Sequence, residues 1–261
     1  MSPYPANAQT TAPRPFLISF SGIDGAGKTT QIEHLSSRLQ NQGLRVLRLC
    51  FWDHVAVWSE MRAGVGHRTL DAGEANGASR QTFSPKNNKH VRKWYLTAAR
   101  WGFYLLDVAR LRRLLASARI RNADVVIFDR YIYDQIANIY SQSLAARSYS
   151  RMVLSVTPRP DLAFVVDASP DAAFARKPEY PLEFVRRNRQ NFLLLKELVP
   201  QLAVISDAAE DEVRKEIYRH ISHSALPERV ALGGKSELAA DQTVVPQQTS
   251  CRVRNGPTAT V

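Results

Sequence analysis

The sequence predicts a three-layer α/β/α fold, in which helices cover both faces of a five-stranded parallel sheet. Apolar, strand-like runs alternate with helical patterns along the chain, and this order is typical of parallel sheets, whose strands need crossover helices. A glycine-rich turn follows the first run, and a carboxylate, Asp129, ends the third. The carboxyl ends of parallel strands lie at one edge of the sheet, where such folds bind ligands.

Five runs predict the strands. The first is apolar and stops at Ser21, while the second alternates apolar and basic residues. The third is a continuous β-branched run, which is typical of a strand buried on both faces. Two shorter apolar runs follow. In order, the predicted strands are residues 16–20, 44–51, 123–129, 162–167 and 202–205.

Helical spacing of apolar residues separates these runs. The helix after the first strand places Ile32, Leu35 and Leu39 on one face, and Gly43 supplies a natural stop. Residues 61–93 form an insertion that is longer than an ordinary connection between two elements. They are therefore either a binding loop or an extension without a role in binding. The predicted helices are residues 29–41, 89–119, 133–147, a short one from 170, 179–198 and 210–221.

Length and composition allow one full α/β domain, because the chain has 261 residues of which 44% are hydrophobic. Residues 1–15 and 223–261 lack periodicity, so we expect a disordered segment at each end of a domain spanning residues 16–222. We see neither a signal-peptide pattern nor an apolar run of roughly 18 residues, which favours a cytoplasmic protein without membrane contact. Cys50 and Cys251 form neither a disulfide framework nor a metal-binding spacing, which favours a reducing interior.

The turn after the first strand reads GIDGAGKT and fits the pattern G-x-x-x-x-G-K-[ST] of a phosphate-binding loop, or P-loop. Glycines let successive backbone N–H groups face phosphate oxygens, and the following helix adds its positive end. Lys28 can reach the outer phosphates, and the Thr29 hydroxyl can bind Mg²⁺. The sequence therefore predicts that a nucleoside triphosphate, for example ATP, binds with Mg²⁺ to Gly22, Ile23, Asp24, Gly25, Ala26, Gly27, Lys28, Thr29 and Thr30.

Asp129 and Arg130 follow the third predicted strand, beside the expected position of the P-loop. A carboxylate at this place can serve Mg²⁺ or its water shell, and an arginine next to it can bind a phosphate through two parallel hydrogen bonds. Arg100 lies in the middle of an apolar helix, where a lone charge needs a partner. A surface ion pair and a ligand contact both remain open for Arg100 on this argument.

The net charge of +11 is concentrated in two segments. Residues 61–93 hold seven basic and two acidic residues, and residues 176–189 hold five basic and two acidic residues. Because both segments are expected beside the phosphate site, small anionic substrates explain the charge better than a long nucleic acid does. The sequence therefore disfavours nucleic acid as a partner.

The sequence resembles the thymidylate kinase family. The strand with GIDGAGKTTQ, the DRY at Asp129–Tyr131 and the helix segment TAARW carry the resemblance, which extends over about residues 16–222. It implies a nucleoside monophosphate kinase that phosphorylates dTMP. It leaves open whether the protein forms a homodimer. It also implies that Asp24, Arg100, Arg130 and Tyr131 bind the acceptor nucleotide, while Thr29 and Asp129 serve Mg²⁺. The catalytic set is then Lys28, Asp129, Arg130 and Arg176.

Arg176 belongs to a predicted lid at about residues 174–190. The variable positions of the P-loop contain no arginine, so stabilisation of transition-state charge is expected from this lid. Arg176 is the first candidate for that role, with Lys177, Arg186 and Arg187 behind it.

Departures from the family pattern all fall on the acceptor side. Phe51–Trp52–Asp53–His54 stands where the family has an R-E-P-G-type turn, Leu96 replaces a stacking Phe, and Asp134 replaces the usual Ser three residues after DRY. Two alternatives to dTMP phosphorylation therefore stay open. One is a kinase of the same fold that acts on another small acceptor, and the other is a nucleotide-binding switch or adaptor without catalysis.

Overall fold

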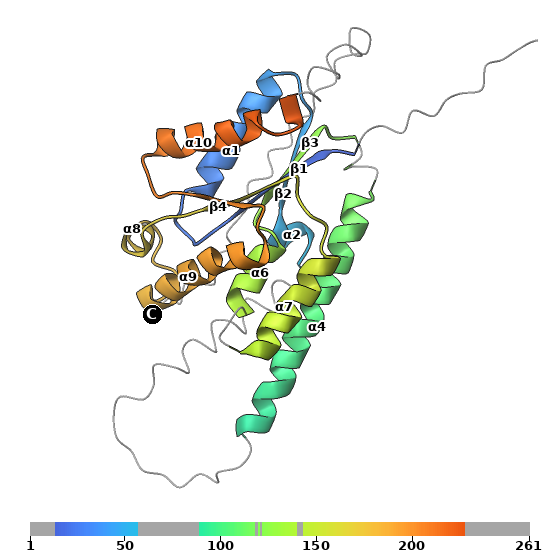
Figure 1. Cartoon of the computed structure of the whole chain (residues 1–261), viewed down its shortest axis with the longest axis vertical. Helices are drawn as coiled ribbons and strands as arrows, with labels where there is room; N and C mark the ends of the chain where they lie inside the picture. Colours follow the sequence, from blue (N-terminus) through green and yellow to red (C-terminus); the bar gives the residue numbers. More distant parts are fainter. Residues whose placement is uncertain (1–13, 57–88, 118–119, 121, 140–142, 228–261) are drawn as a thin grey trace, which may run out of the picture.

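The structure is a computed structural model that describes residues 14–56, 89–117, 120, 122–139 and 143–227, with the side chains of residues 89–100 left out (Figure 1). Most of the predicted insertion, and nearly all of both predicted tails, therefore lie outside the described residues. Lys89 already belongs to a helix, so the last residues of the segment 61–93 begin that helix.

Five strands form one parallel sheet, as the sequence predicts. Their order is β2-β3-β1-β4-β5, and every neighbouring pair is parallel. β1 is buried along its whole length, and β3 is buried except at Asp129, which explains the nearly continuous apolar character of both runs. The strands are β1 (Phe16–Ser21), β2 (Val46–Cys50), β3 (Val125–Asp129), β4 (Leu162–Val166) and β5 (Leu202–Ile205).

Helices cover both faces of this sheet, and the predicted three-layer α/β/α class is confirmed (Figure 1). Two of them, α1 (Lys28–Asn41) and α10 (Glu210–Ser222), lie on one face. The helices on the other face are α4 (Lys89–Leu115), α6 (Ile132–Ile139), α7 (Leu144–Val156) and α9 (Leu182–Leu198).

None of the described helices is long and apolar enough to cross a membrane.

The strand register determines where the site forms. Phe20 of β1 lies level with Asp129 of β3, so the turn after β1 and the turn after β3 leave the sheet side by side. The backbone N–H of Arg130 donates to the carbonyl oxygen of Phe20 at 2.9 Å and joins these two turns. Two short helices, α2 (Phe51–His54) and α8 (Pro170–Arg176), follow β2 and β4 at the same edge.

The structure corrects the predicted elements after β2 and β3. Phe51, expected to end the second strand, instead begins α2, and the single helix expected over residues 133–147 is two helices, α6 and α7. Ser143 starts the second of these, because its hydroxyl accepts a hydrogen bond from the Ala146 N–H at 3.1 Å.

The described fold also extends beyond the expected domain ends. Leu226 is buried in the core, past the predicted boundary at residue 222. Arg14 lies before the predicted start and forms an ion pair with Asp161 at 2.6 Å. Cys50 is disulfide-bonded, contrary to the expectation that the cysteines form no disulfide framework.

Candidate active site

The turn between β1 and α1 has the shape that its glycines allow. Gly22 adopts φ 134°, and a Cβ at this position would lie 2.4 Å from the carbonyl oxygen of Val166 in β4. Gly25 adopts φ 82°, and a Cβ there would lie 2.5 Å from the carbonyl oxygen of Ala173 in α8. Both positions therefore exclude other residue types, and the P-loop packs directly on the end of β4 and on α8.

Lys28 is the first residue of α1 and points back into the P-loop. Its side chain is nearly buried, and its ammonium donates to the carbonyl oxygens of Gly22 at 2.9 Å and Ile23 at 2.8 Å. Burial lowers the pKa of Lys28 to about 8, and the nearby Arg130 charge adds to this effect, although three carboxylates oppose it. A nucleotide phosphate would favour the charged ammonium and raise this pKa again.

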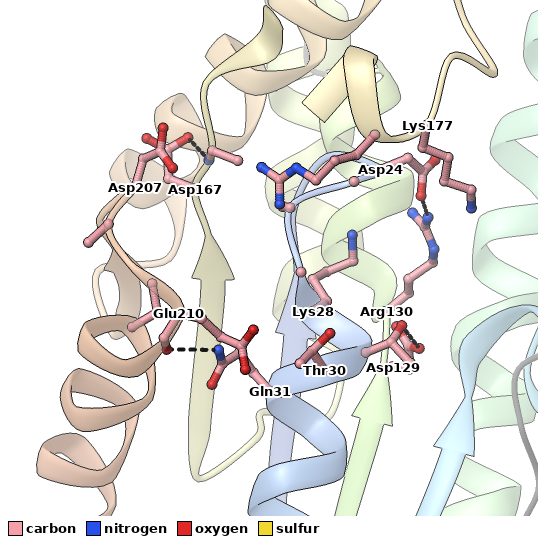
Figure 2. Close-up of a pocket in the computed structure, with 18 residues that line it drawn as sticks. Asp24, Lys28, Thr30, Gln31, Asp129, Arg130, Asp167, Lys177, Asp207 and Glu210 are labelled. Atoms are coloured by element: carbon pink, nitrogen blue, oxygen red, sulfur yellow. Dashed lines mark hydrogen bonds and ion pairs between the residues drawn. The ribbon is translucent and has the colours of Figure 1, made fainter. Parts of the chain in front are cut away.

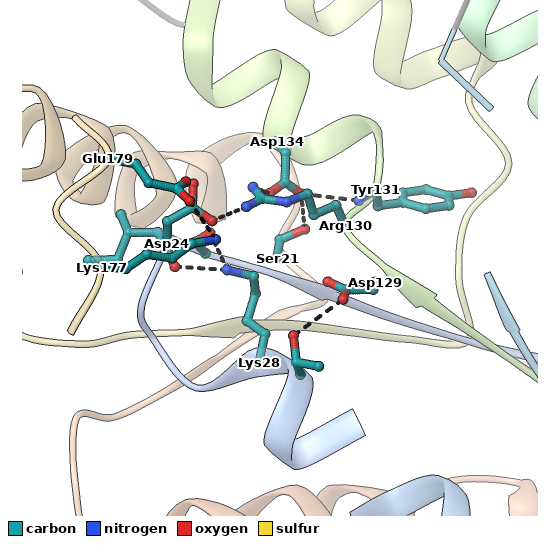
Figure 3. Close-up of polar contacts among 12 residues, drawn as sticks. Ser21, Asp24, Lys28, Asp129, Arg130, Tyr131, Asp134, Lys177 and Glu179 are labelled. Atoms are coloured by element: carbon teal, nitrogen blue, oxygen red, sulfur yellow. Dashed lines mark hydrogen bonds and ion pairs between the residues drawn. The ribbon is translucent and has the colours of Figure 1, made fainter. Parts of the chain in front are cut away.

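Thr29, in the first turn of α1, faces Asp129, the last residue of β3. The Thr29 hydroxyl lies 3.5 Å from a carboxylate oxygen of Asp129 (Figure 3). A hydroxyl and a carboxylate are oxygen ligands of the kind that Mg²⁺ prefers, and this ion usually takes one or two such protein ligands together with waters and substrate phosphates. Among the described residues, no group of three or more His, Cys, Asp or Glu side chains could hold a metal ion. The pair therefore fits a magnesium ion that arrives with a nucleotide.

Arg130 and Asp24 form an ion pair between the turn after β3 and the P-loop (Figure 3). Arg130 adopts φ 66°, a left-handed conformation that is costly for a residue other than glycine and that often marks functional sites. Burial alone would raise the pKa of Asp24, but the charges of Arg130, Lys28 and Lys177 outweigh it and hold this pKa below its usual value. Asp24 is therefore ionised at neutral pH.

Asp134 is a buried carboxylate on the far side of the same arginine. Its oxygens accept hydrogen bonds from Ser21 Oγ at 2.7 Å, from the Tyr131 N–H at 3.1 Å and from Arg130 Nη1 at 3.3 Å. Burial raises the pKa of Asp134, against the opposing effects of Arg130 and Lys28. The sequence marked Asp134 only as a departure from a family pattern, and it carried no sign of the contact with Ser21.

A cavity of about 530 Å³ lies over these groups (Figure 2). One side consists of residues 24–31 of the P-loop and α1, with Asp129 and Arg130 after β3. The opposite side carries acidic residues that follow β4 and β5, among them Asp167, Asp207 and Glu210 (Figure 2). The cavity therefore joins the phosphate-binding turn to a second wall, which the sequence prediction did not identify.

Hydrogen bonds to neighbouring elements hold this second wall in place. Asp207 accepts from the Ser169 N–H at 2.7 Å, and the buried amide of Gln31 donates to the Glu210 carbonyl oxygen at 3.2 Å. The sequence signal for this wall was weak, because it consists of polar residues just after a short strand, where many proteins have an ordinary turn.

The structure separates the cations of the predicted lid. Arg176 and Lys177 line the cavity, whereas Arg186 and Arg187 do not. Arg186 forms ion pairs with Glu183 at 2.9 Å and with Asp171 at 3.0 Å. Among the four candidates, only Arg176 and Lys177 therefore lie where a bound nucleotide could meet them.

Two predicted acceptor residues are placed differently from the rest of the set. Tyr131 is fully buried in the core, and its hydroxyl donates to the Pro158 carbonyl oxygen at 2.6 Å, so its side chain does not line the cavity. Arg100 lies within α4, but its side chain is outside the described part of the structure. Thr30 lines the cavity, while Ile23 is buried beneath the loop and contributes its carbonyl oxygen to Lys28.

Comparison with known sequences finds several relatives that carry the same name, although no protein-family model matches the chain. A "Probable thymidylate kinase" of Pyrococcus abyssi is 26% identical over 224 residues, which cover 82% of this chain and 98% of that protein. A "Probable thymidylate kinase" of Archaeoglobus fulgidus is 25% identical over 214 residues, which cover 78% of this chain and 94% of that protein. A "Thymidylate kinase" of Halothermothrix orenii is 26% identical over 224 residues, which cover 80% of this chain and 97% of that protein.

Among solved structures, the thymidylate kinase from Ehrlichia chaffeensis is similar with a TM-score of 0.48 and 22% sequence identity, covering 80% of this chain and 99% of that chain. The sequence relatives match the chain from end to end of their own length, and they bear out the resemblance that the P-loop and the DRY segment indicated. Over most of its length, this chain is similar in sequence to proteins named thymidylate kinase.

Proposed function

We propose that this protein is an ATP-dependent nucleoside monophosphate kinase that transfers the terminal phosphoryl group of ATP to dTMP. The observation that carries the proposal is the position of Arg130, which lies beside the P-loop and reaches Asp24 within it. A protein that only binds ATP needs the P-loop but has no need of a second phosphate-binding cation next to it. This arrangement favours transfer between two phosphates over a noncatalytic switch or adaptor.

On the donor side, Lys28 would hold the outer phosphates of ATP, and the P-loop N–H groups would bind the others. Thr29 and Asp129 would hold Mg²⁺, which neutralises charge on the transferring group. Their oxygen atoms lie 3.5 Å apart, and the cavity that both residues line supports this assignment.

On the acceptor side, Arg130 would bind the phosphate of the monophosphate, and Asp24 would face that phosphate or the sugar 3′-hydroxyl. Arg176, which also lines the cavity, would stabilise charge that develops during transfer. A domain from about residue 16, with a lid over about residues 174–190, is part of the same proposal.

The named relatives support dTMP as the acceptor. Leu96 lacks the aromatic face that would stack on thymine, so we expect only a modest preference for dTMP over other pyrimidine nucleotides. A homodimer located in the cytoplasm also belongs to the proposal. Exposed apolar side chains on α4 and α7, among them Leu106 and Met152, support the dimer, and light scattering on the purified protein would test it.

The experiment that tests the proposed function is a measurement of ATP consumption with dTMP, dUMP, dCMP, dAMP and unphosphorylated nucleosides, alongside a reaction without acceptor. We expect dTMP to give the highest kcat/KM. Stimulation by a nucleoside alone would favour the kinase for another small acceptor. Equal ATP consumption in every reaction would favour a nucleotide-binding protein without transfer.

A further inference from the structure

Both terminal nitrogens of the Arg130 guanidinium are engaged by carboxylates. Nη2 donates to Asp24, and Nη1 donates to Asp134 at 3.3 Å (Figure 3). The two carboxylates differ in their surroundings, because Asp24 lines the cavity and is 24% exposed, whereas the side chain of Asp134 is only 3% exposed. One carboxylate therefore holds the arginine from the side of the ligand and the other from within the protein.

Asp134 is itself fixed at three points. Besides Arg130, it accepts hydrogen bonds from Ser21, the last residue of β1, and from the backbone N–H of Tyr131, just after β3. It thus joins the ends of the two central strands between which the site forms. A buried carboxylate keeps its charge only while such partners remain, so loss of its arginine would be costly.

This difference decides which contact an acceptor phosphate would displace. Asp24 lies at the cavity and can turn to solvent or to a ligand hydroxyl when Arg130 leaves it. Asp134 has no such alternative, because solvent scarcely reaches it. A phosphate entering from the cavity should therefore replace Asp24 and leave the bond between Asp134 and Arg130 intact.

We propose that Asp134 is a positioning residue for Arg130. It keeps its hydrogen bond with Arg130 Nη1, while the opposite edge of the guanidinium exchanges its contact with Asp24 for a contact with the acceptor phosphate. The edge formed by Nη2 and Nε carries two parallel N–H donors, which suit two oxygens of one phosphate. Asp134 touches no substrate in this arrangement and acts only through Arg130. The inference rests on the proposed function, because it assigns Arg130 to the acceptor.

A double-mutant cycle tests this coupling. Asp134→Asn removes the charge and keeps the shape, and Arg130→Lys keeps the charge and removes the guanidinium fork. Calorimetry would give the Kd for dTMP of the wild-type protein, the two single variants and the double variant. We expect Asp134→Asn to weaken dTMP binding at least about tenfold when Arg130 is present, and by less than about threefold in the Arg130→Lys background.

Asp124→Asn is the matched control. Asp124 precedes β3 at its other end and accepts three hydrogen bonds from Arg45, at 2.8, 3.0 and 2.8 Å. We expect this variant to leave the Kd for dTMP unchanged. The Kd for ATP should change less than about twofold in both Asp→Asn variants, since a purely structural defect at Asp134 would disturb donor and acceptor alike.

Each outcome decides the matter. Equal weakening of dTMP binding by Asp134→Asn in both backgrounds, or no weakening in either, overturns the inference while the proposed function stands. A wild-type protein that binds ATP but no nucleoside monophosphate contradicts the proposed function and the inference with it. Should Asp134→Asn fail to fold, Ser21→Ala removes one hydrogen bond from Asp134 and keeps its charge, and selective weakening of dTMP binding in that variant is then the expected result. An unchanged dTMP Kd in Ser21→Ala would overturn the inference.

Discussion

The Lys28 ammonium donates a hydrogen bond to the Gly22 carbonyl oxygen at 2.9 Å, so the lysine of the P-loop lies folded over the turn that begins at that glycine. The two residues are six positions apart in the sequence, and the start of α1 brings them together. The charge that should meet the ATP phosphates is thus held at the loop by the loop's own carbonyl oxygens.

Lys28→Met should lower turnover by about 10²-fold or more, because no other described P-loop side chain can place a positive charge on the outer phosphates. The same variant should not lower the melting temperature, since it removes a buried charge. Steady-state kinetics and thermal unfolding measure the two effects. Turnover like that of the wild-type protein would contradict the P-loop assignment.

ATP affinity should fall as pH rises through the pKa of Lys28 at about 8, because phosphates bind the charged ammonium better than the neutral amine. The pKa in the folded chain lies below the ordinary value of 10.5, so the unfolded chain binds this proton more tightly between these two values. The contribution of Lys28 to the free energy of unfolding therefore rises with pH across that window. Titration of ATP at pH 7, 8 and 9 checks the binding effect, and Lys28→Met should lose the pH dependence. The same dependence in Lys28→Met would assign it to another group.

Thr29→Val should raise the Mg²⁺ concentration needed for half-maximal activity at least about tenfold, because it removes a hydroxyl ligand while keeping the side-chain shape. Binding of ATP in the absence of Mg²⁺ should change little. A Mg²⁺ titration of the initial rate, with Asp129→Asn in parallel, measures this. If neither variant alters the Mg²⁺ requirement, the cation is bound elsewhere.

Arg176→Ala should lower kcat by roughly 10²-fold or more and raise the KM for ATP far less, as expected for a group that acts on transition-state charge. Arg186→Ala is its control, because Arg186 is exposed, is paired with Glu183 and Asp171, and does not line the cavity. Steady-state kinetics on both variants distinguishes the two positions. An equal loss of kcat in both would mean that the whole lid rearranges during transfer.

The sequence could predict those parts of the fold and site that depend on local patterns. Strand periodicity identified the five strands, and the P-loop pattern identified the turn whose glycines the packing on β4 and α8 demands. The division between α6 and α7 escaped it, because the start of α7 rests on one hydrogen bond that the Ser143 hydroxyl accepts from the Ala146 N–H. Long-range contacts also escaped it, such as that of Ser21 with Asp134, which no local spacing encodes.

The basic residues of the predicted lid are a second case in which the sequence could not predict tertiary contacts. Arg176 and Arg186 are alike as residues in a basic segment, and the sequence could rank them only by resemblance. Their roles in the structure follow from neighbours, since Asp171 and Glu183 engage Arg186 while the end of α8 directs Arg176 to the cavity. Which cation is available depends on tertiary packing that composition does not reveal.

The central claim is phosphoryl transfer to a nucleoside monophosphate held by Arg130. Incubation with dTMP and ATP labelled at the γ-phosphate, followed by separation of the products, tests this most directly. We expect the label to appear in dTDP, and we expect Arg130→Lys to lower its rate of appearance while ATP affinity barely changes. Lys28→Met should lower that rate about 10²-fold or more. Label found only in inorganic phosphate, at a rate independent of dTMP and unchanged in Arg130→Lys, would contradict it.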